Sequence, residues 1–298
     1  METLNCLNNI FLFYAYKYMP EGPEVKYLTN YLNHQFKNKT LTKINIKGGR
    51  YLKHGNPSGY DNFVKKLPLK VEAIKCKGKF MYWLFKDSDV TLWNTLGMSG
   101  WWIKEKENHN NLEFVFNNAK IYFNDMRNFG TIKFCKVDKL QKKLDILGPD
   151  ILDKKNQFEL FMKRIKRKRN DTYIASALLD QKVAAGCGNY IRAECLYICK
   201  ISPFRKIKDL SDDEINKIWD VLRQLGWNYY DEKEGKKLKI IDGKYKLSAK
   251  YKKKGPSKYK PGPGFFLVYR QDKDPSGNKV KHDKIKDRMI HYVPSLQK

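Results

Sequence analysis

The spacing of apolar residues changes near residue 150, and this change constrains the fold more than any other feature of the sequence. Between residues 40 and 123, short apolar runs are separated by breaks rich in Gly, Asn and Pro, a pattern typical of consecutive β-strands. After Leu147-Gly148-Pro149-Asp150 the apolar residues recur at helical spacing. A strand-rich block followed by a helical block predicts an α+β chain of several domains.

The strand-rich block follows a helix. This helix is expected to begin near Gly22, with Pro23 and Glu24 in its first turn, where both residue types are favoured. Several short strands in series then predict a β-sandwich or barrel. The expected strands are residues 42–46, 69–73, 79–85, 90–96, 112–116 and 121–123.

The helical block ends with a strong start signal for its last helix. Ser211 and Glu214 have the spacing of a capping box, in which each side chain accepts a hydrogen bond from the other residue's backbone N–H. The expected helices are residues 158–168, 172–179, 190–200 and 211–230.

The C-terminal part is expected to hold a linker and a hairpin. Residues 236–263 are Lys-rich with few apolar side chains, which predicts a mobile segment. The runs 265–269 and 285–293 predict two strands joined through a turn at residues 274–278. The expected organisation is an extension at residues 1–19, a β-sandwich domain at 20–150, a helical domain at 151–235, the linker at 236–263 and a β-hairpin at 264–298.

The chain carries a large excess of positive charge. It has 60 Lys and Arg residues against 32 Asp and Glu, a formal net charge of +28 at pH 7. This excess predicts a polyanionic partner, because each neutralised phosphate releases counterions. A Lys-rich composition spread over the whole surface is the alternative. Residues 163–169 and 236–260 concentrate the charge. The first run is interpreted as a solvated helix face or an accessory contact, and the second as a non-specific contact with the polyanion, without a catalytic role.

Other classes of protein are disfavoured by the cysteines and by the hydropathy pattern. The six cysteines are scattered and form no C-x-x-C pair or zinc spacing, which predicts reduced thiols and no metal. No segment approaches the roughly 20 apolar residues that cross a bilayer, and the run at 10–16 lacks the features of a signal peptide. We expect an intracellular protein that is not secreted and binds neither a membrane nor a cofactor.

Five short blocks narrow the interpretation to one family. Together, and in this order, they resemble the formamidopyrimidine-DNA glycosylase/endonuclease VIII family from Met19 to the C-terminus. The blocks are Met19-Pro20-Glu21-Gly22-Pro23-Glu24-Val25, Gly78-Lys79-Phe80, Leu96-Gly97-Met98-Ser99-Gly100, Asp125-Met126-Arg127-Asn128-Phe129-Gly130, and Asp180-Gln181 leading to Gly186-Cys187-Gly188-Asn189-Tyr190.

The resemblance implies a fold and an activity. The expected fold is an N-terminal β-sandwich with a leading helix, a helix–two-turn–helix domain and a C-terminal β-hairpin finger, with DNA bound between the domains. The expected activity is that of a bifunctional DNA glycosylase/AP lyase, acting as a monomer. Its substrates would be double-stranded DNA with oxidised bases or abasic sites, and single-stranded DNA as a further candidate. Oxidised pyrimidines and formamidopyrimidines are favoured over 8-oxoguanine.

The resemblance assigns the chemistry to Pro20, Glu21 and Lys79. As the first residue of a mature chain, Pro20 would present a free amine with a pKa near 8, able to attack C1′ and leave an iminium. Glu21 would be the proton donor. A Pro-Glu pair is also a plain helix start, but Pro23 and Glu24 already satisfy that role. Lys79 would anchor a phosphate beside the lesion and promote departure of the base, although a single lysine is more often a solvated surface charge.

The other assigned residues would bind DNA. Met98, Arg127 and Phe129 match the residues that fill the gap left by an extruded base, for which apolar wedges and a cation are suited; core residues at strand ends are the alternative. Gly188 and Asn189 would bind phosphate at a helix N-terminus. Arg288 would contact phosphate from the finger, and Glu194 would be structural.

Two features depart from the family pattern. No cysteine follows Cys199, so the finger at residues 264–298 is expected to be a zincless one, held by packing alone. Pro20 is preceded by nineteen residues, which makes its nitrogen an amide. Either translation starts at Met19 and the methionine is removed, or the protein is a catalytically inactive lesion- or nucleic-acid-binding protein of the same fold. A ribosomal-type RNA binder is a third interpretation, and a free proline amine with Glu21 distinguishes the enzyme from both.

Overall fold

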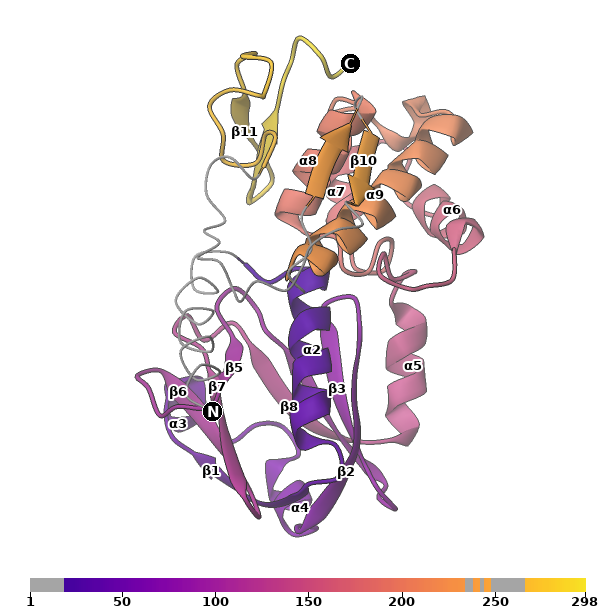
Figure 1. The fold of residues 1–298 in the computed structure, drawn as a ribbon. Helices are drawn as coiled ribbons and strands as arrows, with labels where there is room; N and C mark the ends of the chain where they lie inside the picture. Colours follow the sequence, from indigo (N-terminus) through magenta and orange to yellow (C-terminus); the bar gives the residue numbers. More distant parts are fainter. Residues whose placement is uncertain (1–18, 234–237, 242–243, 248–265) are drawn as a thin grey trace. The chain divides into compact units, whose positions relative to one another are not determined.

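The computed structural model describes residues 19–233, 238–241, 244–247 and 266–298, which fall into two compact units (Figure 1). The first unit runs to Asp145 and the second from Ile146 to Lys298, except that residues 21–23 belong to the second unit. Of the predicted extension, residues 1–18 lie outside the described residues.

The first unit is rich in short strands, as predicted. Its leading helix begins at Gly22, and the predicted strands are each present. In chain order the elements are α2 (Gly22–Phe36), β1 (Thr40–Ile46), α3 (Gly49–Lys53), α4 (Tyr60–Val64), β2 (Leu69–Lys77), β3 (Phe80–Phe85), β4 (Val90–Thr95), β5 (Trp101–Ile103), β6 (Asn110–Phe116), β7 (Ala119–Asn124), β8 (Thr131–Lys136) and α5 (Asp138–Ile146).

These strands form an antiparallel β-sandwich. The hydrogen-bonded order is β5-β7-β6-β1-β2-β3-β4-β8. Only two register pairs, Thr40 with Lys70 and Leu41 with Leu69, join β1 to β2. The order therefore divides into two four-stranded halves that meet at one corner, β5-β7-β6-β1 and β2-β3-β4-β8.

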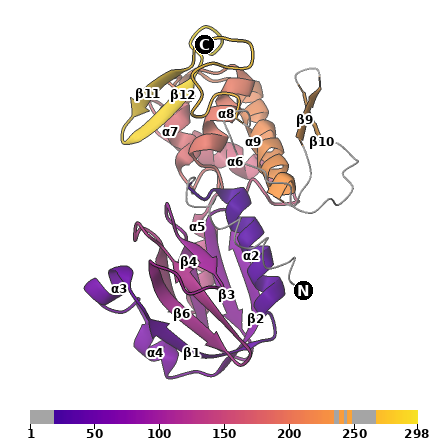
Figure 2. The same cartoon turned by 60° about the vertical axis from the view of Figure 1, so that its left-hand side comes forward.

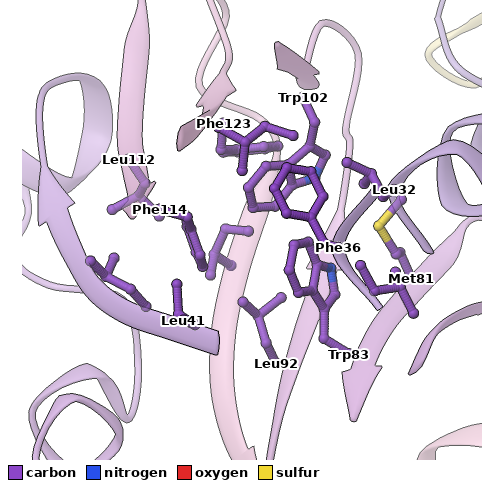
Figure 3. Close-up of a cluster of buried hydrophobic side chains, with 14 of the residues drawn as sticks. Leu32, Phe36, Leu41, Met81, Trp83, Leu92, Trp102, Leu112, Phe114 and Phe123 are labelled. Carbon is purple, nitrogen blue, oxygen red and sulfur yellow. The ribbon is translucent and has the colours of Figure 1, made fainter. Parts of the chain in front are cut away.

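Aromatic side chains from both halves fill the space between them (Figure 3). The ring of Trp83 on β3 lies 6.0 Å from Phe114 and 6.5 Å from Phe116, both on β6, measured between ring centroids. Phe36 of α2 adds a third layer, 4.6 Å from Phe116, and α2 lies along the sandwich (Figures 1 and 2). Because each buried aromatic side chain contributes roughly 1.5–3 kcal/mol, this cluster holds the two halves together.

Three features of the first unit differ from the sequence prediction. β5 was missed because its three residues are all buried and show no alternation. β8 was missed although Ile132 and Phe134 are buried and alternate with the more exposed Thr131, Lys133 and Cys135. Lys79 was expected in a strand, but Gly78 and Lys79 form the two-residue turn between β2 and β3, with Gly78 at φ 55°.

The second unit contains the predicted helices. They are α6 (Phe158–Lys166), α7 (Ile174–Leu179), α8 (Asn189–Cys199) and α9 (Asp212–Lys233), with a short 3₁₀ turn, η1 (Ile207–Asp209), before α9. The capping box is confirmed: Ser211 N–H donates to Glu214 Oε2 at 2.9 Å, and Glu214 N–H donates to Ser211 Oγ at 3.2 Å. Within the described residues no helix is long and apolar enough to cross a membrane.

Two short strands interrupt the segment that was predicted to be a mobile linker. β9 (Leu238–Ile241) pairs with β10 (Lys244–Leu247) in antiparallel register (Figure 2). The sequence contains a signal for this hairpin. The dipeptide Asp-Gly at 242–243 is favoured in hairpin turns, and on each side of it stands a short run of apolar residues and lysines. The rest of the linker lies outside the described residues.

The C-terminal hairpin is present, but its strands are not the predicted pair. β11 (Lys281–Ile285) pairs with β12 (Arg288–Tyr292) through a turn at Lys286 and Asp287. The run predicted at 265–269 is bend and turn in its described part. The predicted turn at 274–278 does form, yet it closes only a single bridge between Lys273 and Lys279. The apolar run misled the prediction because those residues pack on α8 and not in a sheet.

The Trp83 side chain offers a test of the sandwich core. Trp83→Ala is expected to lower the free energy of unfolding by about 3–5 kcal/mol, since a large buried side chain is removed from a filled space. Urea denaturation followed by circular dichroism measures the change. Trp83→Phe should cost less, because the buried indole N–H has no hydrogen-bond partner. A loss no larger than that of Leu52→Ala, whose side chain is 66% exposed, would contradict this account.

Candidate functional site

Glu21 is the most constrained of the predicted site residues. Its side chain is 1% exposed and its carboxylate accepts hydrogen bonds from the backbone N–H groups of Tyr190, at 2.9 Å, and Ile191, at 3.3 Å. These amides belong to the first turn of α8, where unpaired N–H groups and the helix dipole favour a negative charge. The start of α8 therefore stabilises the Glu21 carboxylate, a partner that the sequence analysis did not identify when it expected a phosphate there.

Glycines allow the backbone to approach closely beside Glu21. Gly22 N–H donates to the carbonyl of Gly186 at 2.9 Å, and a Cβ added to Gly22 would lie 2.9 Å from Gly186 Cα. Gly186 has φ +97°, a conformation that side chains disfavour. The Gln181 side chain fixes the same loop, accepting from Gly186 N–H at 2.9 Å and donating to the Cys187 carbonyl at 2.8 Å. This geometry explains why the Gln181 and glycine blocks occur together.

Lys79 lies in the two-residue turn between β2 and β3, and the residues on either side of this turn contact α5. In the first unit, Lys77 Nζ donates to the carbonyl of Leu144 near the end of α5 at 2.9 Å. The ammonium of Lys143 lies 5.3 Å from the centre of the Phe80 ring. Lys79 itself is half-buried, and among the described residues no hydrogen bond or ion pair holds its ammonium. A positive charge without a protein partner is suited to binding an anion.

The structure brings Met98, Arg127 and Phe129 together on two adjoining loops of the first unit. A Cβ added to Gly97 would lie 2.5 Å from the backbone of Phe129, so the loops touch backbone to backbone. Arg127 is exposed, Phe129 is 56% exposed, and the guanidinium lies 5.3 Å from the Phe129 ring centre. Met98 is half-buried. The alternative of a core role is wrong for Phe129.

Buried polar groups hold these two loops. Ser99 Oγ donates to Asp125 Oδ1 at 2.5 Å and accepts from Arg127 N–H at 3.0 Å. The other oxygen of Asp125 accepts from Gly130 N–H at 2.6 Å. Because Asp125 is fully buried, its carboxylate is shielded from water and these bonds are strong. The sequence analysis did not single out Ser99 or Asp125, although both belong to the blocks it quoted.

Asn189 is held in place by a buried arginine. Asn189 is 8% exposed, and its Oδ1 accepts a hydrogen bond from Nη2 of Arg192. Arg192 is fully buried and also donates to the carbonyls of Ala175, at 3.2 Å, and Met289, at 3.0 Å. Burial lowers the pKa of Arg192 to about 10, so it remains charged at neutral pH. A charged residue in the middle of an apolar helix was the available signal, and it was overlooked.

Arg288 begins β12 and is exposed. The next residue, Met289, accepts the hydrogen bond from Arg192, so one buried guanidinium touches both Asn189 and the strand that carries Arg288. Gly188 is buried at the N-cap of α8, in an extended conformation. The predicted residues Gly188, Asn189 and Arg288 are therefore organised by α8.

Two further side chains of α8 fasten the finger. The Glu194 carboxylate accepts from the backbone N–H groups of Leu267, Val268 and Tyr269 at 2.8–3.0 Å, which agrees with the structural role expected for it. Tyr197 donates its hydroxyl to Asp274 at 3.0 Å. Among the described residues no group of three or more His, Cys, Asp and Glu side chains could hold a metal ion.

The basic run at residues 163–169 is partly neutralised. Lys166 pairs with Asp212 at 2.8 Å, Lys168 pairs with Asp180, and Arg169 pairs with Asp171 at 2.9 Å. Exposed pairs of this kind contribute little to stability. They reduce the local positive charge, which fits the interpretation of a solvated helix face.

Three family models match this chain in consecutive segments. They are the formamidopyrimidine-DNA glycosylase N-terminal domain at residues 19–132, its H2TH domain at 147–225 and its C-terminal domain at 263–298. The chain belongs to the formamidopyrimidine-DNA glycosylase family. The resemblance drawn from the five blocks is confirmed, and so is the fold that it implied.

Individual relatives agree with this assignment. Formamidopyrimidine-DNA glycosylase of Oceanobacillus iheyensis is 31% identical over 209 residues, covering 67% of this chain and 72% of the relative. The Ureaplasma parvum protein of the same name is 28% identical, covering 94% of this chain and 100% of the relative.

Solved structures share the fold. A complex of an inhibited LlFpg with DNA containing N7-benzyl-Fapy-dG has a TM-score of 0.76 at 22% identity, covering 94% of this chain and 100% of that one. The Lactococcus lactis enzyme bound non-covalently to DNA with an AP site has a TM-score of 0.74 at 20% identity, covering 93% and 99%.

The buried carboxylate of Glu194 predicts a pH dependence of stability. Burial raises the pKa of Glu194 to about 7, against the lowering effect of its three backbone hydrogen bonds. As pH rises, the unfolded chain therefore loses this proton at a lower pH than the folded chain does. The free energy of unfolding falls by about 3 kcal/mol as pH rises from about 4.5 to above 7. The free energy of unfolding of the native chain should fall by that amount relative to Glu194→Gln, measured by urea denaturation across this range. A constant difference between the two proteins would contradict the buried charge.

Proposed function

We propose that this protein is a bifunctional DNA glycosylase/AP lyase with Pro20 as its nucleophile. The observation that carries the proposal is the Glu21 carboxylate, buried against two N–H groups of α8 and adjacent in sequence to Pro20. A buried carboxylate is costly unless it is paired, and its placement beside a proline that can become an N-terminus gives it a chemical purpose.

The proposed reaction follows from the two groups. A Pro20 released from its peptide bond is a secondary amine, and its lone pair attacks C1′ of the damaged nucleotide. The bond from C1′ to the base breaks, and the base leaves with that electron pair and takes a proton from water. Glu21 takes the amine proton and returns it to O4′, which opens the sugar ring and leaves an iminium between Pro20 and C1′. Loss of the C2′ proton then expels the 3′ phosphate, and a second elimination expels the 5′ phosphate. The ionised state that α8 favours suits Glu21 to accept the first proton before donating it.

The remaining residues bind the DNA in this proposal. Lys79, whose ammonium is not paired within the described part of the chain, binds a phosphate next to the lesion, and Asn189 and Arg288 bind further phosphates from the second unit. Met98, Arg127 and Phe129 fill the gap left by the extruded nucleotide, since their loops present an apolar wedge and a cation to solvent. Gly188 allows close approach of the backbone.

The proposed substrate is double-stranded DNA with an oxidised base or an abasic site, and single-stranded DNA is a second candidate. Relatives of this family are named for formamidopyrimidine, and one Lactococcus lactis neighbour is bound to DNA with an oxidised pyrimidine. The two loops carrying the wedge residues favour a duplex, because only a duplex has a gap to fill.

A catalytically inactive lesion-binding protein is the second candidate function. It is favoured by one observation, that nineteen residues precede Pro20 in the sequence. In a chain that keeps them, the Pro20 nitrogen is an amide and cannot attack C1′.

The start of the chain decides between the two candidates. A protein made from Met19 is expected to lose its methionine, nick DNA at abasic sites and become covalently trapped on DNA under borohydride, which reduces the iminium. The full 298-residue chain should bind the same DNA without trapping. Glu21→Gln in the short form should lose excision of damaged bases and keep much of its lyase activity, because an abasic sugar opens to its aldehyde without a proton from Glu21.

Mass spectrometry of the N-terminus is the control for this comparison. If the intact long form traps as efficiently as the short form, Pro20 is not the nucleophile, and Lys79 becomes the next candidate. If neither form traps or nicks, the protein is a binding protein of this fold.

The finger offers a separate test. Excision is expected to survive prolonged chelation, because the finger's own contacts come from Glu194, Tyr197 and Arg192. Arg288→Ala should weaken lesion binding and excision about tenfold or more, as expected for loss of a charged phosphate contact. Lys284→Ala, another exposed cation of the same hairpin, is the matched control. Activity lost to chelator and restored by zinc would overturn the zincless finger.

A further inference from the structure

The loop that carries Arg127 and Phe129 is bonded to α3 through the residue between them. Asn128 Oδ1 accepts two hydrogen bonds, from the backbone N–H of Arg50 at 3.0 Å and from Nδ2 of Asn111 at 2.9 Å. Asn128 has φ 57°, the left-handed conformation that Asn adopts more readily than most residues. Its side chain therefore faces a fixed partner while its neighbours are exposed.

Arg50 holds the same loop a second time. Its Nη1 lies 3.4 Å from the carbonyl oxygen of Asn128 and 3.4 Å from that of Gly130. These two carbonyls bracket Phe129. A single guanidinium thus binds the carbonyl oxygens of the residues before and after Phe129.

The geometry of α3 leaves room for this contact only because Gly49 has no side chain. A Cβ added at Gly49 would lie 2.4 Å from Asn128 Oδ1 and 2.2 Å from Asn111 Oδ1, and Gly49 also has φ +61°. Any larger residue would have to displace Asn128. Gly49, Arg50, Asn111 and Asn128 are hereafter called the α3 latch.

We propose that the α3 latch positions Arg127 and Phe129 for insertion into the DNA stack, and that Arg50 and Asn128 are positioning residues of the lesion search. This inference rests on the proposed void-filling role of the loop. Insertion between bases costs a few kcal/mol of unstacking, and a loop that had to order itself at the same time would add its own entropy to that cost. A loop fixed beforehand by buried hydrogen bonds avoids the second cost.

The latch differs from the Ser99 and Asp125 contacts in what it controls. Those contacts fix the backbone at residues 125, 127 and 130. The latch holds the Asn128 side chain and the carbonyl groups of Asn128 and Gly130, on either side of Phe129. Loss of the latch should therefore impair insertion more than it impairs folding.

Three variants separate the contributions. Asn128→Gly keeps the left-handed backbone and removes both side-chain hydrogen bonds. Asn128→Asp keeps an oxygen that can accept both, and is the conservative rescue. Gly49→Ala replaces none of the hydrogen-bonding residues of the latch. Its added Cβ would clash with the side chains of Asn128 and Asn111 and displace them.

The measurement is the fluorescence of 2-aminopurine placed opposite an abasic-site analogue in a duplex, using the full chain. Insertion of the loop changes the stacking of this base, and the signal requires no chemistry from Pro20. Arg127→Ala and Phe129→Ala set the signal of a failed insertion. Asn128→Gly and Gly49→Ala are expected to lower the insertion amplitude toward that level. In the form that begins at Pro20, they should also reduce kcat/KM on duplex lesions about tenfold more than on single-stranded lesions. Asn128→Asp should restore most of the amplitude.

The outcomes distinguish the inference from the function on which it rests. If Arg127→Ala and Phe129→Ala leave the signal unchanged, the void-filling role itself is wrong. If they abolish it while Asn128→Gly and Gly49→Ala keep the native amplitude, the loop inserts but the latch does not position it. Thermal melting of each variant is the control, and Arg50→Lys, which keeps the backbone N–H and loses the bracketing guanidinium, tests the same point if Asn128→Gly does not fold.

Discussion

The contact between the Glu21 carboxylate and the first turn of α8 is the interaction on which the second unit depends. A carboxylate that is 1% exposed is tolerated only where donors compensate for lost water, and here two backbone amides and the helix dipole do so. The contact joins a residue near Met19 to one nearly 170 positions later. Gly186 allows the close approach beside it, with φ +97° and its Cα 2.9 Å from a Cβ added to Gly22. The candidate nucleophile and the α8 N-terminus are thereby linked through a single charged group.

The same helix also organises a finger that has no cysteines. Arg192, Glu194 and Tyr197 extend from α8 to Met289, to the backbone at 267–269 and to Asp274. Hydrogen bonds to buried charged groups are stronger than those between neutral groups, and three such fastenings on one rigid helix can define a small hairpin. Aromatic packing adds to them, with the Tyr269 ring 5.2 Å from Phe266 and 4.9 Å from His291. The expectation of packing alone was therefore incomplete.

Periodicity predicted the fold well because burial of apolar side chains creates it. The leading helix, the alternating strands and the capping box of Ser211 and Glu214 each follow from local pattern. Elements without alternation, such as β5, and the strand pairing of the hairpin were missed, because register depends on partners distant in sequence. The candidate site came from short motifs compared with a family, and its roles for Pro20, Lys79 and Arg288 remain predictions. The partners of Glu21, Asn189 and Asn128 could not be foreseen, since each is a long-range polar contact.

The loop of Arg127 and Phe129 shows why long-range polar contacts are frequent in segments that lack a periodic pattern of apolar residues. Hydrophobic burial cannot fix this loop, because its large apolar side chains, Met126 and Phe129, are 47% and 56% exposed. Polar groups must then supply the order, and they can do so only if they are themselves buried, where a hydrogen bond does not compete with water. The exposure of the loop's apolar side chains therefore requires the burial of polar groups such as Asp125 and Asn111, which order the loop in their place. Exposed apolar side chains above buried polar groups invert the usual distribution of polarity, which is what the insertion into stacked bases that we propose for this loop would require.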